Sequence, residues 1–221
     1  ASNQDLPAIS DLCAVYAAAG VQCIDVAADS AVIHAAREGL NWVELTLGKR
    51  PWLMVSVSDG KDDHFRKAFF KPELCPKDCH RPCEKACPAD AINEIKGINP
   101  DLCYGCGRCL PVCPSNLILE KDQFLNNQDI ESLIAKMRPD AIEIHTAPGR
   151  NEAFDATLVA ITRANIPLQR LAISCSAKPH NLSPEELAQV LWERHSSLRK
   201  YKLRPIWQLD GRPMSGDIGP G

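Results

Sequence analysis

Long apolar runs are absent from the sequence. No stretch reaches about eighteen consecutive apolar residues, the length at which a membrane-spanning helix becomes a candidate. The first residues also lack the charged-then-apolar pattern of a signal peptide. Charge of one sign is scarce as well, because the net charge is only −3. We therefore expect no membrane span, and no recruitment of nucleic acid or of an anionic membrane by the overall charge.

A glycine-rich phosphate-binding loop is also missing from the sequence. The remaining composition is ordinary for a globular protein, with 45% hydrophobic and 24% charged residues. A chain of 221 residues is long enough for one or two domains with a sizeable core.

Cysteine, in contrast, is abundant, with 11 residues. Most of them lie in two runs of four, and each run ends in Cys-Pro. The second run has the spacing with which bacterial ferredoxins bind a [4Fe–4S] cluster, and the first run is a looser version with wider gaps. The candidate ligands, in chain order, are Cys75, Cys79, Cys83, Cys87, Cys103, Cys106, Cys109 and Cys113.

The fourth cysteine of each run lies too far along the chain to close its own cluster easily. In two-cluster ferredoxins this cysteine binds the other cluster. We therefore predict two [4Fe–4S] clusters with crossed ligation. Cluster A takes Cys75, Cys79, Cys83 and Cys113, and cluster B takes Cys103, Cys106, Cys109 and Cys87.

Disulfides and zinc are the alternative uses of so many cysteines. A disulfide framework suits a small secreted scaffold, which this chain does not resemble. Zinc sites favour two Cys-x2-Cys pairs with a long gap rather than four cysteines followed by proline. The other three cysteines, Cys13, Cys23 and Cys175, lie in apolar segments and are expected to be buried thiols in a reducing compartment.

Outside the cysteine runs, short apolar strands alternate with amphipathic helices. Strands are expected at 21–28, 51–58, 141–146, 168–176 and 205–210. Helices are expected from Asn3 or Asp5 to Gly20, and at 31–39, 128–137, 154–164 and 184–201. This alternation is typical of βαβ units and predicts an α/β fold with a parallel sheet.

A closed barrel of this kind needs eight strands, so the five visible strands indicate either an open sheet or a barrel with further strands beyond one or both ends of the chain. We favour the second interpretation, an incomplete TIM-like barrel. Residues 1–60 and 126–221 would form this α/β domain. Residues 61–125 would form an inserted, ferredoxin-like domain with two [4Fe–4S] clusters. Prolines and cysteines replace hydrophobic periodicity there, so the clusters must supply much of its core.

Polar residues gather on one alternating face near the ends of the expected strands. Because side chains alternate along a strand, each polar pair points one way and the apolar residues point the other way. The shared polar face of these strands predicts a ligand pocket. The alternative interpretation is a polar interior whose side chains hydrogen-bond one another. Asp59, Arg150 and Arg212 follow on adjoining loops. The pocket candidates are Asp25, Ser58, Glu143, His145, Ser174 and Asp210.

Two further stretches, together with the cysteine runs, carry a family resemblance. They are residues 1–29, which include Cys-Ile-Asp-Val-Ala-Ala-Asp, and residues 207–219, which read Trp-Gln-Leu-Asp-Gly-Arg-Pro-Met-Ser-Gly-Asp-Ile-Gly. With them the chain resembles the light-dependent period A (LdpA) family of cyanobacteria, which has relatives in plastids. The chain departs from that family by lacking the first strand and by stopping at Gly221, and its first cysteine run is widened.

The resemblance implies an iron–sulfur protein that reports cellular redox state to the circadian clock together with clock proteins. It also implies that the eight cysteines are the cluster ligands, and that the protein acts in the cyanobacterial cytoplasm or the chloroplast stroma. Redox sensing or electron transfer is therefore the favoured function. The alternatives are an oxidoreductase that passes electrons to a flavin, quinone or metabolite in the pocket, and a subunit of a photosynthetic or respiratory electron-transfer assembly.

Overall fold

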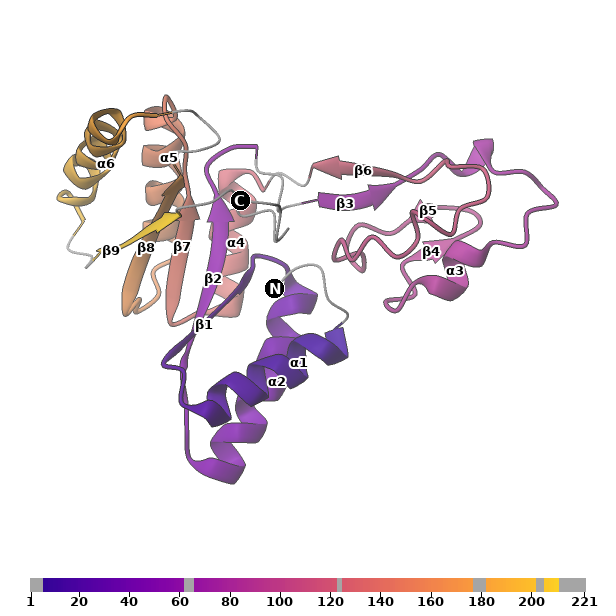
Figure 1. The fold of residues 1–221 in the computed structure, drawn as a ribbon, viewed down its shortest axis with the longest axis horizontal. Coiled ribbons are helices and arrows are strands. Elements are labelled where there is room, and N and C mark those ends of the chain that lie inside the picture. Colours follow the sequence, from indigo (N-terminus) through magenta and orange to yellow (C-terminus); the bar gives the residue numbers. More distant parts are fainter. Residues whose placement is uncertain (1–5, 62–65, 123–124, 177–181, 202–204, 211–221) are drawn as a thin grey trace. The chain divides into compact units, whose positions relative to one another are not determined.

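The computed structural model describes residues 6–61, 66–122, 125–176, 182–201 and 205–210 (Figure 1). They fall into two compact units, residues 1–51 with 63–123, and residues 52–62 with 124–221. The first unit thus joins the N-terminal helices to the cysteine-rich segment. The predicted division into an α/β domain and a separate inserted domain remains a prediction.

A five-stranded sheet has the order β1-β2-β7-β8-β9, with parallel pairing between β2, β7, β8 and β9. This confirms the predicted α/β class, whereas the barrel itself remains a prediction. The register aligns Ser58, His145 and Ser174 on three neighbouring strands. The strands are β1 (Cys23–Ala27), β2 (Trp52–Ser58), β7 (Ala141–His145), β8 (Arg170–Ser176) and β9 (Pro205–Asp210).

Three helices of the second unit alternate with the strands of the sheet: α4 (Asn127–Met137), α5 (Asn151–Arg163) and α6 (Pro184–Leu198). Helix α4 packs against α5, and α5 packs against α6. The expected start of α6 is confirmed by a capping box, in which Ser183 and Glu186 bond each other's backbone amides. No helix in the described parts of the chain is both long and apolar enough to cross a membrane.

In the first unit, α1 (Leu6–Ala19) packs against α2 (Ser30–Leu47). The expected end of the second helix at Gly39 was wrong, because Gly39 is a point of close packing and not a stop signal. A Cβ atom there would lie 2.1 Å from the carbonyl oxygen of Ser10. The helix ends instead at Gly48, whose φ of 66° is the left-handed conformation that glycine adopts without strain.

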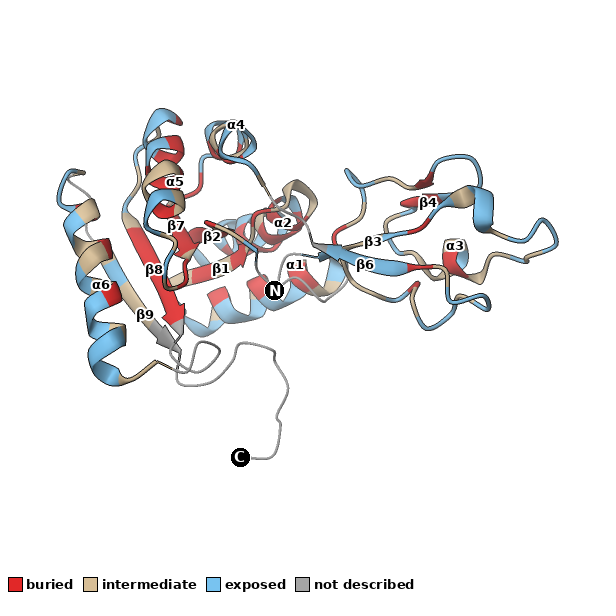
Figure 2. Cartoon of the chain, turned by 90° about the horizontal axis from the view of Figure 1, so that it is seen from above, coloured by how far each residue is buried: buried red, intermediate tan, exposed pale blue. Residues whose placement is uncertain are grey.

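The cysteine-rich segment has little regular structure. It contains one antiparallel ribbon of β3 (Arg66–Phe69) and β6 (Leu119–Asp122), which was not predicted from the sequence. The remaining elements are η1 (Pro72–Leu74), α3 (Pro82–Ala86), β4 (Ile92–Asn93) and β5 (Gly97–Ile98). Figure 2 shows that exposed and half-buried residues dominate this segment, whereas strands β2, β7 and β8 are mostly buried.

Candidate iron–sulfur site

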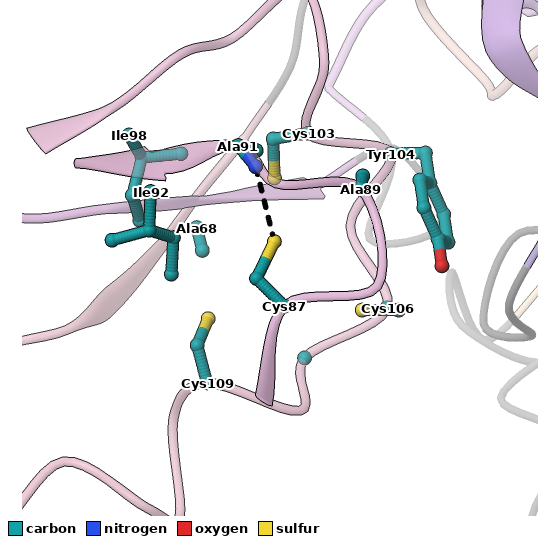
Figure 3. Close-up of a pocket in the computed structure, with 11 residues that line it drawn as sticks. Ala68, Cys87, Ala89, Ala91, Ile92, Ile98, Cys103, Tyr104, Cys106 and Cys109 are labelled. Atoms are coloured by element: carbon teal, nitrogen blue, oxygen red, sulfur yellow. Dashed lines mark hydrogen bonds between the residues drawn. The ribbon is translucent and has the colours of Figure 1, made fainter. Parts of the chain in front are cut away.

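Cys87, from the first cysteine run, lies among the first three cysteines of the second run. Together with Cys103, Cys106 and Cys109 it lines one cavity (Figure 3). Burial, followed by the negative charges of the other three thiolates, raises the pKa of Cys109 to about 12. These four thiols are therefore close enough to influence one another electrically, and they are the predicted ligands of cluster B.

Cys113, from the second run, is in turn coupled to the first run. Burial raises the pKa of Cys75, and the neighbouring Cys79 and Cys113 add to the increase. Burial also raises the pKa of Cys83, again with a contribution from Cys113. Cys87 thus lines a cavity with cysteines of the other run, as crossed ligation requires. Cys113 packs against the buried cluster that contains both Cys83 and Cys109.

The two fourth cysteines have the same local structure. The Cys87 Sγ atom accepts a hydrogen bond from the Ala91 amide at 3.3 Å, and the Cys113 Sγ atom accepts one from the Leu117 amide at 3.4 Å. Burial alone would raise the pKa of Cys113, but the surrounding backbone amides outweigh burial and lower it. Amides that point at sulfur favour the thiolate form, which is the form that binds metal.

Glycine shapes the loop that carries the second run. Gly105 has a φ of +81°, and a Cβ atom there would lie 2.1 Å from the carbonyl oxygen of Arg66 on β3. Gly107 has a φ of +72°, but no heavy atom lies within 4 Å of its Cβ position. Gly105 therefore allows both a left-handed turn and a close backbone approach, whereas Gly107 allows only the turn.

Apolar side chains surround the thiols. Phe70, Cys83, Ile92, Cys109 and Ile118 form a buried cluster of this segment. Ala68 and Ile98 line the cavity beside Cys87 and Cys109 (Figure 3). Two ligand cysteines are thus themselves core residues, so anything that binds them also completes the core.

The donor set fits an iron–sulfur cluster. A [4Fe–4S] cluster is held by four thiolates that each bind a different iron atom. Thiols that line a cavity fit this requirement. The residues that would hold clusters are the eight predicted cysteines, and that assignment remains a prediction.

Several pocket candidates do lie together in the second unit. Glu143 is fully buried, and its Oε2 atom accepts a hydrogen bond from Ser56 Oγ at 2.6 Å and lies 2.9 Å from His145 Nε2. The Ser58 hydroxyl donates to the Gly60 carbonyl at 2.8 Å. Ser174 is buried on the neighbouring strand. Most of these polar side chains form hydrogen bonds with one another or with nearby backbone. This arrangement is the one expected if the polar face is an interior that hydrogen-bonds itself rather than a ligand pocket.

Two candidates lie on the outer strands of the sheet. Asp25 lies on β1, the strand next to β2 in the sheet order. Asp210 ends β9, but its side chain is outside the described part, as is the whole of Arg212. The predicted pocket therefore remains a prediction.

A second buried polar network was not predicted from the sequence. Arg194 is only 1% exposed, and its Nε atom donates to Thr146 Oγ1 at 3.1 Å. Thr146 donates in turn to Asp59 Oδ2 at 2.5 Å, and Arg150 reaches the other oxygen of Asp59 at 3.2 Å.

Burial dominates the electrostatics of this network. It raises the pKa of Asp59, even though Thr146 and Arg150 act in the opposite direction. Burial also lowers the pKa of Arg194. The sequence does contain a sign that Arg194 is buried. The residue lies on the buried stripe of α6, between Val190 and Leu198.

Comparison with known proteins agrees with the cysteine geometry. Residues 75–124 match the model of the LdpA Fe-S cluster-binding domain, and residues 133–221 match that of the light dependent period A C-terminal domain. The chain is 45% identical over its full length to Light dependent period A of Synechococcus elongatus, and it spans 61% of that relative.

Ferredoxins match a smaller share of the chain. An uncharacterized ferredoxin of Methanocaldococcus jannaschii is 38% identical over 32% of this chain and 40% of its own length. A ferredoxin of Alicyclobacillus acidocaldarius is 46% identical over 18% of this chain and 55% of its own length. No solved structure matches the chain. Because both family models agree with the relative that matches the whole of this chain, the chain belongs to the light-dependent period A family and carries its iron–sulfur-binding domain.

Proposed function

We propose that the chain binds two [4Fe–4S] clusters with crossed ligation and works as a redox sensor or electron-transfer protein. The observation that carries this proposal is the position of Cys87 among the cysteines of the second run. Cys87 lines one cavity with Cys103, Cys106 and Cys109. Cys113 contributes to the raised pKa of Cys75 and Cys83, which agrees with the same exchange. Crossed ligation of this kind is the arrangement of two-cluster ferredoxins.

The residues of the chain would hold and tune the clusters. A bound [4Fe–4S] cluster supplies one-electron chemistry, without a bond being made or broken in a substrate. The cysteine thiolates hold the iron, and the Ala91 and Leu117 amides donate to two of the ligand sulfurs. Hydrogen bonds to sulfur and solvent exposure are two of the features that set a cluster potential. Buried Phe70 and Ile118 limit solvent access on the apolar side.

The relative named Light dependent period A supports a more specific role. We infer that the clusters report cellular redox state to the circadian clock through protein partners, in the cyanobacterial cytoplasm or the chloroplast stroma. The α/β part would be an incomplete TIM-like barrel, completed by strands from outside this chain. Sequential strand order in the sheet supports this, because strands of such a barrel follow one another in chain order.

The oxidoreductase alternative has less support. Ser56, Glu143 and His145 bond one another in the described structure, so their arrangement does not call for a flavin or substrate. Redox sensing or electron transfer therefore remains the better proposal.

Iron and sulfide analysis of the anaerobically purified chain tests the proposal. About eight iron and eight sulfide per chain are expected for two cubane clusters. Reduction should give the EPR signals of two interacting [4Fe–4S] clusters. Stoichiometric zinc in place of iron, or iron for only one cluster, would overturn the assignment.

A further inference from the structure

Lys67, the second residue of β3, joins two parts of the first compact unit that are far apart in the sequence. Its Nζ atom lies 2.9 Å from Asp29 Oδ2 and donates a hydrogen bond to the Pro100 carbonyl oxygen at 2.6 Å. The side chains of Lys67 and Asp29 are only 16% and 15% exposed. Because charges that are partly withdrawn from water are screened less than surface charges, this bridge is a stronger contact than a surface ion pair of the same length.

The Pro100 end of the bridge belongs to a turn that leads into the second cysteine run. The Cys103 amide donates to the Asn99 carbonyl at 3.0 Å and closes this turn, which we call the cluster-B turn (residues 99–103). The Asn99 amide donates to the Ala91 carbonyl at 2.7 Å, and Ala91 and Cys103 line the same cavity (Figure 3). Lys67 therefore contacts the turn that positions Cys103, a predicted ligand of cluster B.

The Asp29 end of the bridge is the N-cap of α2. The Asp29 Oδ1 atom accepts hydrogen bonds from the Ala31 amide at 2.9 Å and from the Val32 amide at 3.4 Å. These bonds satisfy backbone donors that have no partner within the helix. The carboxylate thus caps α2 with one oxygen atom and binds Lys67 with the other. The position of the Lys67 ammonium group therefore bears directly on the start of this helix.

We propose that Lys67 couples the cluster-B turn to the start of α2, so that loss of cluster B loosens this helix. The inference rests on the proposed pair of clusters. Without its cluster, the cysteine-rich segment loses part of its core, and the turn and β3 no longer hold Lys67 against Asp29. The N-cap carboxylate then loses its cation. Because such coupling is reciprocal, a change at Asp29 must also weaken the retention of cluster B.

Hydrogen exchange of the amides of residues 33–36 in α2 tests the coupling, in the anaerobically purified, cluster-loaded chain and after treatment with an iron chelator. Lys67→Met removes both contacts of the ammonium group. Asp29→Asn removes the ion pair but keeps an N-cap, because asparagine caps helices as well as aspartate does. Arg66→Met is the matched control. It removes a cation from the neighbouring position, where Arg66 pairs with Glu120 at 2.7 Å within the β3–β6 ribbon.

In the native chain and in Arg66→Met, iron removal should raise the exchange rates of residues 33–36 about fivefold, the effect expected from losing one charged contact. In Lys67→Met and Asp29→Asn these rates should already be raised while the clusters are bound, and iron removal should add little. Both variants should also lose cluster B to the chelator about fivefold faster than the native chain. Cluster A should be lost at the native rate. The EPR signal that disappears in Cys106→Ser identifies cluster B.

Equal exchange of residues 33–36 with and without iron in the native chain would overturn the coupling. So would a native-like response of Lys67→Met, or of Asp29→Asn if Lys67→Met does not fold. Iron and sulfide content, measured on the same samples, separates this result from the proposed function. Full content for two clusters would leave the cluster assignment standing while the coupling falls. Absence of iron–sulfur clusters from the native chain would overturn the proposed function, and the inference with it.

Discussion

The cysteine-rich segment and the sheet of the second unit have cores built from different kinds of residue. Residues 66–122 bury few large apolar side chains, and two members of their buried cluster are predicted metal ligands, Cys83 and Cys109. The sheet buries full rows of aliphatic residues, such as Ile142, Ile144 and Leu171. Each fully buried aliphatic side chain contributes about 1.5–3 kcal/mol. The sheet can therefore be stable through its own side chains, whereas the segment depends on what its cysteines bind.

Removal of iron should give the largest difference between the two regions. Chelation or exposure to oxygen should unfold residues 66–122, because metal binding is coupled to folding where the apolar core is small. Strands β2, β7 and β8 should stay folded. Hydrogen exchange with and without iron measures this. Equal protection of the cysteine-rich segment in both states would show that its core does not need the clusters.

Replacement of Arg194 should affect the sheet unit alone. Arg194→Ala removes the hydrogen bond that Arg194 donates to Thr146. It also removes a cation that lowers the pKa of the buried Asp59. Loss of one partner from a buried charged network costs about 3–5 kcal/mol. Denaturant unfolding of the second unit measures the loss, and iron content should stay native. The exposed Arg199→Ala is the control, with a change below about 0.5 kcal/mol expected. A similar small change in Arg194→Ala would contradict the importance of the network.

Two glycines of the second cysteine run give a matched pair within the segment. Gly105→Ala would place a Cβ atom 2.1 Å from the Arg66 carbonyl oxygen, whereas Gly107→Ala would meet no atom within 4 Å. Both substitutions add left-handed strain of about 1–2 kcal/mol. Gly105→Ala should in addition displace the loop and reduce occupancy of cluster B, as measured by iron content and EPR. Equal cluster occupancy in the two variants would show that the contact with Arg66 is not limiting.

The smallest expected effect is the pH dependence due to Asp59. Burial raises its pKa in the folded state above the ordinary value of 3.8. The folded state therefore favours the protonated carboxyl. Its stability contribution is fully present below pH 3.8 and is lost as pH rises through the raised pKa.

Asp59→Asn removes this titration. The free energy of unfolding of the native chain should fall relative to that of Asp59→Asn as pH rises through this range. Measurement of both proteins over the same pH series cancels any acid lability of the clusters. A relative gain by the native chain over that range would mean that Arg150 and Thr146 outweigh burial.

The sheet and the cysteine runs could be predicted because their signals are local. Alternation along strands located all five strands, and the gaps between cysteines are by themselves typical of cluster ligands. The ribbon of β3 and β6 was missed because its strands are short, and Arg66 and Leu119 are exposed rather than alternating with buried neighbours. The ribbon forms by pairing of two segments that are distant in sequence, and such pairing leaves no local pattern.

Some single residues act through tertiary contacts, and their roles could not be predicted from local sequence patterns. Gly39 resembles a helix end in sequence, but it is needed for contact with the backbone of Ser10. An arginine in α6 would be expected at the surface. Arg194 is buried instead, and it donates hydrogen bonds to Thr146 and to the Ala147 carbonyl. Polar strand residues such as Ser58, His145 and Ser174 were placed correctly on neighbouring strands, yet strand periodicity is the same whether they bind a ligand or one another.

Crossed ligation is the central claim, and Cys113→Ser tests it most directly. In this variant, cluster-resolved EPR should show loss or alteration of the cluster whose signal depends on Cys79, in the first run. The cluster that depends on Cys106, in the second run, should remain. Single Cys79→Ser and Cys106→Ser variants assign the two signals. If Cys113→Ser instead removes the cluster that depends on Cys106 and leaves the other intact, each run binds its own cluster and the crossed arrangement is wrong.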